Sequence, residues 1–500
     1  MDIKRAKEEI KNAISAYLLK DEYGEYVIPS VRQRPIFLIG APGIGKTQIM
    51  EQIAKECGLG IVSYTITHHT RQSAIGLPFI SKHVYGEKEY SVTEYTMSEI
   101  VASVYDKIEK TGLKEGILFV DEINCVSETL APAMLQFLQY KSFGNHQIPE
   151  GWIIVTAGNP PEYNKSVREF DVVTMDRVKK IEVQPEFSVW KEYAYKSNIH
   201  GAVISYLTAK PSYFYQMEMT VDGMLFSTPR GWEDLSNMLY AYEKQEKEAD
   251  WEVVVQYIQY PKIAKDFANY LELYHKYRTD YRMDEVLEGT IDERVKKKLN
   301  HASFDERLSI VSLLLAKLTE QFRQTYRREG ETEVLFKCLK RYKSNLEFGE
   351  DAVSCLEEVK EQMIETLEYK KKAELLNREE KYSFSRTIQK LESYIMVLKT
   401  ENLYDKEEGF EKVRSLFAKE KEIYEKLEEA SGKMLEYAFD FMEIMFGTSQ
   451  EMVAFVTELN ANYYSAQFLQ EYSCERYYQY NKNVLFEERE QNLLKRIERL

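Results

Sequence analysis

The sequence predicts an α/β fold, in which helices sandwich a parallel sheet, followed by a helical lid and a long all-α C-terminal region. Short apolar segments rich in Ile and Val, without strict alternation, are typical of buried parallel strands. Five such segments are found, at residues 36–39, 61–66, 117–120, 153–156 and 181–183. Helical patterns alternate with them, so we expect helices on both faces of the sheet.

The rest of the chain is predicted to be helical. Residues 2–20 have an amphipathic pattern that Asp2 can cap, and residues 187–290 lose the strand signal. Beyond residue 300, apolar side chains recur at three-four spacing, as in seams between paired helices. The seams comprise Ile388, Leu391, Ile395 and Leu398, and then Ile423, Leu427, Ala430, Met434, Tyr437 and Phe441. Because the spacing breaks after a few turns, it favours packing within the chain over an intermolecular coiled coil.

Composition limits the classes of partner. The chain has 500 residues and a formal net charge of −15, from 67 Lys and Arg against 82 Asp and Glu. This charge argues against a general attraction to nucleic acid or anionic lipid. Five scattered cysteines form no C-x-x-C pair, which favours a reducing compartment. The charged N-terminal segment and the lack of a long apolar stretch lead us to expect a cytoplasmic protein with no membrane partner.

The segment GAPGIGKT, residues 40–47, matches the phosphate-loop pattern G-x-x-x-x-G-K-[ST]. A predicted strand precedes it and a predicted helix follows, a context that points backbone N–H groups at a phosphate. Lys46 is expected to reach the β- and γ-phosphates of ATP, and the Thr47 hydroxyl to ligate Mg²⁺. The predicted nucleotide-binding residues are Gly40, Ala41, Pro42, Gly43, Ile44, Gly45, Lys46, Thr47 and Gln48.

Polar side chains follow two further predicted strands. Asp121 and Glu122 come directly after residues 117–120, at the sheet edge where the phosphate loop is expected. We expect Asp121 to hold Mg²⁺, directly or through water, and Glu122 to act as general base on the attacking water. Asn159 ends the next strand, where its amide could hold that water or a γ-phosphate oxygen. The alternative for Asn159 is a turn residue before a proline.

These motifs resemble those of the AAA+ ATPases and, within them, the MoxR-like and dynein-related group. GAPGIGKT is similar to Walker A, ILFVDEIN to Walker B and VTAGNP to sensor 1. VREFDVVTMDRVKKIEV resembles the segment with the group's arginine finger, where Arg177 is the matching position and Arg168 the alternative. Val178 follows where the family usually has Phe. STPRGWEDL resembles the sensor 2 helix and makes Arg230 its arginine.

The resemblance implies a homo-oligomeric ring, commonly a hexamer, assembled with ATP. In such a ring Arg177 would face the neighbour's ATP, while Arg230 would touch the ATP of its own subunit. A guanidinium neutralises charge that develops on the γ-phosphoryl group in the transition state. The implied catalytic set is therefore Lys46, Glu122, Asn159, Arg177 and Arg230. The resemblance also implies a protein client, for which a von Willebrand factor type A domain protein is one candidate.

Four parts of the chain follow from these motifs. We expect residues 1–30 to form a helix on the core and residues 31–185 the AAA+ nucleotide-binding domain. Residues 186–295 are expected to be a helical lid with sensor 2, and residues 296–500 an all-helical region that binds a partner.

Two hairpins are expected within the α/β domain, over residues 79–95 and residues 141–152, the second turning at Gly144. Tyr85 and Phe143 are either contacts for a client or ordinary packing aromatics.

The function that these patterns favour is ATP hydrolysis coupled to remodelling or activation of a protein, as in a MoxR-like chaperone. A second hypothesis is a nucleotide-dependent scaffold or switch with negligible turnover, against which the intact Glu122 argues. A third is the motor subunit of a nucleic-acid-processing system, against which the acidic charge argues.

Overall fold

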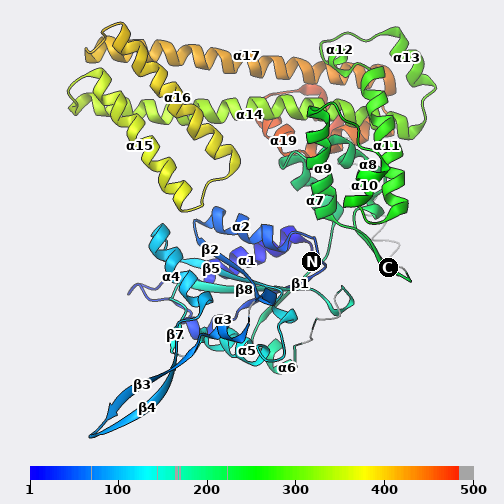
Figure 1. The fold of residues 1–500 in the computed structure, drawn as a ribbon. Helices are drawn as coiled ribbons and strands as arrows, with labels where there is room; N and C mark the ends of the chain where they lie inside the picture. The colour runs from blue at the N-terminus through cyan, green and yellow to red at the C-terminus, as the bar shows by residue number, and fades with distance from the viewer. Residues whose placement is uncertain (69, 144, 164–166, 168–169, 222, 483–500) are drawn as a thin grey trace. The chain divides into compact units, whose positions relative to one another are not determined.

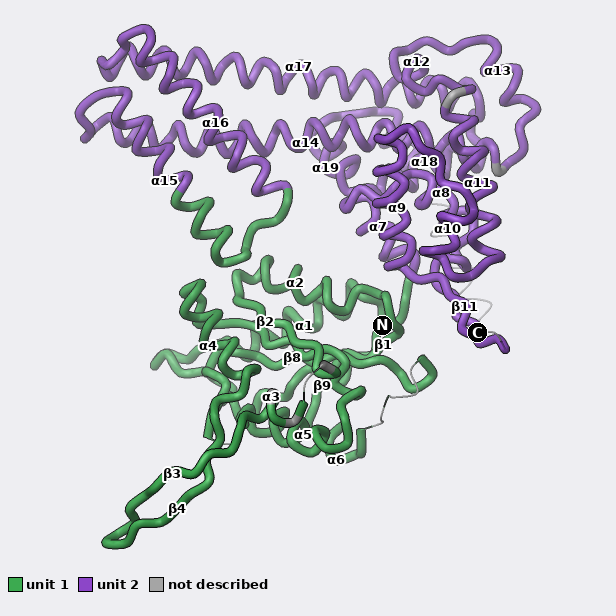
Figure 2. Tube along the Cα trace, in the orientation of Figure 1, with its two compact units in different colours: residues 1–186, 365–378 green, residues 187–364, 379–500 purple. Residues whose placement is uncertain are grey.

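Two compact units make up the chain, as the computed structural model in Figures 1 and 2 shows. Unit 1 contains residues 1–186 and 365–378, and unit 2 contains residues 187–364 and the chain from 379 onward. The structure describes residues 1–68, 70–143, 145–163, 167, 170–221 and 223–482.

A five-stranded parallel sheet forms the centre of unit 1, in the order β2-β5-β8-β1-β9. Its strands are β1 (Ile36–Gly40), β2 (Gly60–Thr65), β5 (Gly116–Asp121), β8 (Trp152–Gly158) and β9 (Lys179–Val183). All five predicted strands are confirmed. Every residue of β8 is buried, and only Asp121 of β5 is not, so these central strands have no solvent-facing side to enforce alternation.

Helices cover the sheet on both faces (Figure 1). They are α1 (Ile3–Tyr17), α2 (Lys46–Cys57), α3 (Arg71–Ile75), α4 (Glu99–Thr111), α5 (Ala131–Tyr140) and α6 (Val172–Met175). Side chains of α4 and α5 join Val62, Leu118 and Ile154 in one core cluster, while α1 and α2 lie over the other face. The predicted N-terminal helix is confirmed, since Asp2 caps α1 by accepting a hydrogen bond from the backbone N–H of Arg5 at 2.8 Å.

Both predicted hairpins are present in unit 1. Strands β3 (Pro78–Tyr85) and β4 (Lys88–Tyr95) form a long antiparallel hairpin whose Tyr85 is 60% exposed. Strands β6 (Ser142–Phe143) and β7 (His146–Gln147) form a short one, whose expected turn residue Gly144 lies outside the described residues. Phe143 is buried and stacks on Phe137 with 4.2 Å between ring centroids. Phe143 is thus a packing aromatic.

Unit 2 is mostly helical, with one correction to the prediction for residues 187–290. Strands β10 (Gln216–Thr220) and β11 (Gly223–Ser227) form an antiparallel hairpin there. The segments QMEMT and GMLFS are short and mostly half-buried, so they show no clear alternation of buried and exposed positions. The helices are α7 (Phe187–Lys196), α8 (Gly201–Ala209), α9 (Pro229–Lys244), α10 (Trp251–Tyr257), α11 (Pro261–Asp280), α12 (Met283–Leu287), α13 (Glu293–Asn300), α14 (Phe304–Phe348), α15 (Ala352–Lys372, which ends in unit 1), α16 (Arg378–Thr400), α17 (Lys406–Phe446), α18 (Gln450–Ala461) and α19 (Tyr463–Glu471).

The long helices α14 and α17 run side by side in unit 2 (Figure 1). The seam predicted on α16 is confirmed at its last three positions, which are buried. The seam predicted on α17 is wrong in register, because Ile423 and Ala430 are exposed and the buried face includes Ser431, Gly432 and Leu435. Small polar residues mark that contact, where the Ser431 hydroxyl meets the α14 side chains of Gln321 and Thr325 at 3.0 and 2.8 Å. Because this face contains small polar residues, a pattern of apolar spacing in the sequence does not reveal it.

In the part of the chain that the structure describes, no helix has both the length and the apolar character that crossing a bilayer requires.

Unit 1 contains a buried lysine, Lys141, directly after α5. Lys141 ends α5 in a left-handed backbone conformation, and only 5% of it is exposed. Its Nζ donates a hydrogen bond to Oε1 of Gln33 at 3.0 Å, which a neutral amine can also make. Burial lowers the pKa of the Lys141 ammonium from about 10.5 to about 8. The folded state therefore releases this proton at a lower pH than the unfolded state does.

We predict that Lys141 makes unit 1 more stable as the pH rises from 8 to 10. In that window the unfolded chain binds more protons than the folded chain, so the stability gained by deprotonation reaches up to about 3 kcal/mol. Lys141→Met should lack this rise, whereas the exposed control Lys55→Met should keep it. Denaturant unfolding between pH 7 and 10, followed by the fluorescence of Trp152 with the other tryptophans replaced, measures it. Identical pH slopes for wild type and Lys141→Met would contradict the assignment.

Candidate functional site

The carboxyl ends of three neighbouring strands meet at one edge of the sheet in unit 1. In the register, Ile39 of β1 pairs with Gly158 of β8, and Val120 of β5 pairs with Thr156 of β8. The residues that follow these strands are therefore adjacent although they are far apart in sequence. This edge is where open parallel sheets place their ligand sites.

The loop between β1 and α2 has a backbone that requires glycine. Gly43 and Gly45 have φ of 75° and 90°, a left-handed region that other residues rarely adopt. Gly40 is required for space instead, because a Cβ there would lie 2.6 Å from the carbonyl oxygen of Val183. Helix α2 then starts at Lys46, so its first N–H groups face the loop. A loop of this shape at a helix N-terminus is a phosphate-binding arrangement.

Lys46 lies buried across this loop. Its Nζ donates hydrogen bonds to the carbonyl oxygens of Gly40 at 2.7 Å and Ala41 at 2.9 Å, and to Oδ1 of Asn159 at 2.9 Å. The structure thus brings together Lys46 and Asn159, which the sequence separates by more than a hundred residues. An ammonium group with three oxygen acceptors around it can exchange one or more of them for phosphate oxygens.

The neighbouring Thr47 hydroxyl donates a hydrogen bond to Oδ2 of Asp121 at 3.1 Å, joining α2 to the end of β5. The other oxygen of Asp121, Oδ1, accepts the backbone N–H of Glu122 at 2.9 Å, which fixes the carboxylate plane. A hydroxyl and a carboxylate oxygen in contact form the hard oxygen donor set that Mg²⁺ prefers. Thr47 and Asp121 therefore fit the ion that the sequence implies.

Glu122 has a strained backbone and an engaged side chain. Its φ of 56° is left-handed, which is unfavourable for a residue with a Cβ. Its Oε2 accepts a hydrogen bond from the Thr67 hydroxyl at 2.8 Å. Thr67 follows β2 in the short helical turn Ile66–His68. Sequence analysis missed Thr67, although its position after the second strand was a usable signal.

Asn124 is a second residue that sequence analysis missed. It is 3% exposed, and its Nδ2 donates a hydrogen bond to the backbone oxygen of Asn159 at 2.7 Å. Its Oδ1 has no hydrogen-bond partner among the described residues, and its side chain lies against the Cα of Gly158. Any side chain at Gly158 would collide with Asn124. Asn124 thus fixes the backbone that carries the Asn159 side chain. The sequence signal that could have identified Asn124 is a polar residue within an otherwise apolar turn.

The charges of the site act on a neighbouring thiol. Burial raises the pKa of Cys125, and the carboxylates of Glu122 and Asp121 raise it further. The thiol therefore stays protonated and is not a nucleophile at neutral pH.

The predicted arginines take no part in the contacts described above. Arg177 follows α6, is exposed and makes no ion pair with the described residues, while its neighbour Val178 is buried in the core. The alternative, Arg168, lies outside the described residues. Arg230 is exposed in the first turn of α9, in unit 2.

Comparison with known proteins supports the class of this unit. The family model described as "ATPase family associated with various cellular activities (AAA)" matches residues 36–175. The match supports an AAA+ ATPase domain there, from a family that generally binds and hydrolyses ATP. It includes the phosphate loop and Asn159, and it ends before Arg177. No curated protein matches the chain.

We predict that Asn124→Ala slows ATP turnover by about three- to tenfold, the value of one hydrogen bond, with a smaller effect on nucleotide affinity. The Asn159 amide loses its fixed backbone, while Lys46 and the loop keep theirs. Steady-state phosphate release and fluorescent-nucleotide titration measure the two effects, with the exposed Asn12→Ala on α1 as control. Wild-type turnover in a folded Asn124→Ala protein would show that the contact is structural only.

Proposed function

We propose that the protein is a Mg²⁺-dependent ATP hydrolase of the MoxR-like AAA+ type, which couples hydrolysis to remodelling or activation of a protein partner. The observation that carries the proposal is the convergence of Lys46, Thr47, Asp121 and Asn159 at one sheet edge. They come from three separate sequence motifs, with Lys46 and Thr47 in the phosphate loop, and their contacts are ones that a nucleotide with its metal ion could replace.

In the proposed mechanism the loop from Gly40 to Gly45 and the first N–H groups of α2 hold the β-phosphate of ATP. Lys46 turns from Gly40 and Ala41 toward the β- and γ-phosphate oxygens. Thr47 and Asp121 would hold Mg²⁺, which supplies positive charge against the phosphate oxygens when bound. Asn159 stays beside Lys46 and orients the attacking water or a γ-phosphate oxygen.

Glu122 is the proposed general base. Its carboxylate must accept a proton from the attacking water, and one of its oxygens already accepts the Thr67 hydroxyl. Turnover therefore requires that Thr67 release this oxygen or that the other oxygen take the proton. The left-handed backbone of Glu122 aims the side chain away from the end of β5 toward Thr67.

The same contact favours a second candidate function, a nucleotide-dependent switch with negligible turnover. If the Thr67 contact holds the whole Glu122 carboxylate away from the attacking water with ATP bound, the protein binds nucleotide and assembles without hydrolysis. Measured turnover distinguishes the two candidates, and Thr67→Ala should raise the turnover of a protein held in this way.

We further propose a homo-oligomeric ring, with a hexamer as the common form of such proteins. The exposed guanidinium of Arg177, with no ion pair among the described residues, supports a role at a neighbour's site. Arg230 is proposed as the sensor 2 arginine of its own subunit. The client is a protein, and the MoxR-like resemblance favours one with a von Willebrand factor type A domain.

We predict that Lys46→Ala weakens ATP binding by about 10- to 150-fold, because charge-assisted hydrogen bonds to phosphate are lost. Glu122→Gln should keep ATP binding and lower turnover by roughly 10²- to 10⁴-fold, the contribution of a general base. Fluorescent-nucleotide titration and phosphate release measure these effects. Wild-type turnover in Glu122→Gln would show that another group is the base.

We predict that Arg177→Ala lowers turnover by roughly 10³-fold, the contribution of an arginine supplied in trans. Arg177→Ala subunits keep the base, and Glu122→Gln subunits keep the arginine. In an equal, random mixture of the two, about a quarter of the ring interfaces pair an intact base with an intact arginine, and these interfaces should regain activity. Sedimentation with and without ATP gives the assembly state. Mixed rings without recovered activity would rule out composite sites at Arg177.

A further inference from the structure

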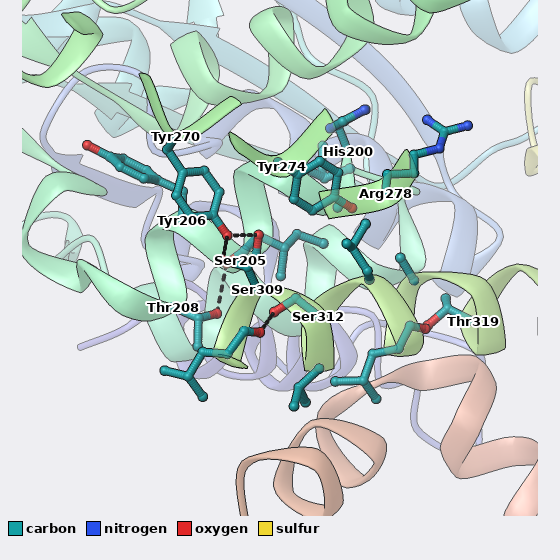
Figure 3. A pocket seen from close by; sticks show the side chains of 18 of the residues that line it. His200, Ser205, Tyr206, Thr208, Tyr270, Tyr274, Arg278, Ser309, Ser312 and Thr319 are labelled. Carbon is teal, nitrogen blue, oxygen red and sulfur yellow. Dashed lines mark hydrogen bonds between the residues drawn. The ribbon is translucent and has the colours of Figure 1, made fainter. Parts of the chain in front are cut away.

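Unit 2 contains a cavity of about 580 Å³, and none of its lining residues is among the candidate nucleotide-site residues. Its walls come mainly from α8, α11 and α14, with smaller parts from α9, α12 and α18 (Figure 3). Most of the wall is apolar, from side chains such as Ile199, Ile204, Leu273, Met283, Leu308 and Val311. This size is within the range of about 300–1,000 Å³ that is typical of small-molecule pockets.

Short side chains on facing helices leave this space open. Helices α8 and α14 come close at Gly201, where a Cβ would lie 3.3 Å from the Cβ of Ala316. Beside that contact the facing residues are Ser205, Ser309 and Ser312, whose side chains are too short to fill the volume. The cavity is therefore built by the helix packing itself.

Nearly all polar groups of the wall already have partners. The Tyr270 hydroxyl donates to Oγ of Ser205 at 2.8 Å and lies 3.2 Å from Oγ of Ser309, as the dashed lines of Figure 3 show. The hydroxyls of Ser312 and Thr208 donate to backbone oxygens of their own helices at 3.0 and 2.7 Å. These hydroxyls already have hydrogen-bond partners within the protein, so they do not require a ligand to satisfy them.

The charges of the wall are also paired. Every acidic side chain that lines the cavity has a basic partner: Glu243 with Arg278 and His200, Asp266 with Lys210, Asp284 with Lys317, Glu320 with Arg323, and Glu458 with Lys191. The lining basic residues are all among these partners. A charged ligand would lose its hydration without gaining a counter-ion, which is strongly unfavourable.

The Tyr274 hydroxyl is the exception. Tyr274 is 4% exposed, and its ring packs against those of His200 and Tyr270. Its hydroxyl lies over Gly201, faces the cavity and has no hydrogen-bond partner among the described residues. Burial, followed by the nearby Tyr270 and Tyr240, raises the pKa of Tyr274, so the group remains a neutral donor. An acceptor oxygen placed in the cavity can receive a hydrogen bond from this hydroxyl.

We propose that this cavity binds an uncharged, largely apolar small molecule whose carbonyl oxygen accepts a hydrogen bond from Tyr274. Paired wall charges exclude ionic ligands, the apolar side chains and tyrosine rings bury the ligand body, and the Tyr274 hydroxyl fixes its orientation. The site is independent of the ATP chemistry proposed above, so either can fail without the other.

The test uses the full chain and two neutral probes. Prodan carries a ketone on a naphthalene ring, and dimethylaminonaphthalene has the same ring without the ketone. We expect saturable binding of both, with a blue-shifted prodan emission. Tyr274→Phe should weaken prodan binding by about three- to tenfold, the value of one neutral hydrogen bond, and leave the binding of dimethylaminonaphthalene unchanged. The exposed Tyr23→Phe is the matched control.

A second variant tests the location. Ser312→Leu adds volume inside the cavity and should abolish binding of both probes while circular dichroism shows a folded protein. Tyr274→Phe removes a single oxygen, so it keeps the test decisive if Ser312→Leu does not fold. Absence of saturable binding to the wild type would overturn the proposal. So would equal affinity of prodan for wild type and Tyr274→Phe, or full binding by a folded Ser312→Leu protein.

Discussion

The candidate nucleotide site depends on one constraint, the position of β8 between β1 and β5 in a parallel sheet. Parallel pairing brings all three carboxyl ends to the same edge, and the register fixes how far each strand extends. The phosphate loop, Asp121 and Asn159 are therefore neighbours by topology, before any side chain interacts. Contacts between side chains then refine this placement, with Lys46 joining the loop to Asn159 and Thr47 joining α2 to Asp121.

Two of these groups are already engaged. Lys46 is hydrogen-bonded within its own loop, and Glu122 is hydrogen-bonded to Thr67. Nucleotide binding at the proposed site would therefore exchange one set of hydrogen bonds for another, and the net gain in free energy would be the difference between the two sets. The exchange also involves the segments that supply the partners, since Asn159 follows β8 and Thr67 follows β2. In the proposed mechanism, a change at the γ-phosphate would thus reach two loops of unit 1 through direct contacts.

The sheet and the phosphate loop could be predicted from sequence because their signals are local. An apolar run shows a buried strand, and glycines at Gly43 and Gly45 show a left-handed loop. Thr67 and Asn124 could not be predicted in the same way, since their roles come from contacts with Glu122 and Asn159 across the sheet edge. The hairpin at residues 216–227 was missed because its strands are short and mostly half-buried, without a clear burial pattern.

One physical cause explains both the wrong seam on α17 and the cavity of unit 2. Helices that meet through small residues show no apolar periodicity, so the sequence does not reveal the contact. At Gly432 of α17 the missing side chain is replaced by the ring of Tyr472, and the contact is filled. At Gly201 of α8 the end of the Tyr274 side chain and the Cβ of Ala316 approach, while the serines beside it leave space. Small residues alone therefore do not determine whether a cavity forms. The outcome depends on whether neighbouring side chains fill the space that the small residues leave.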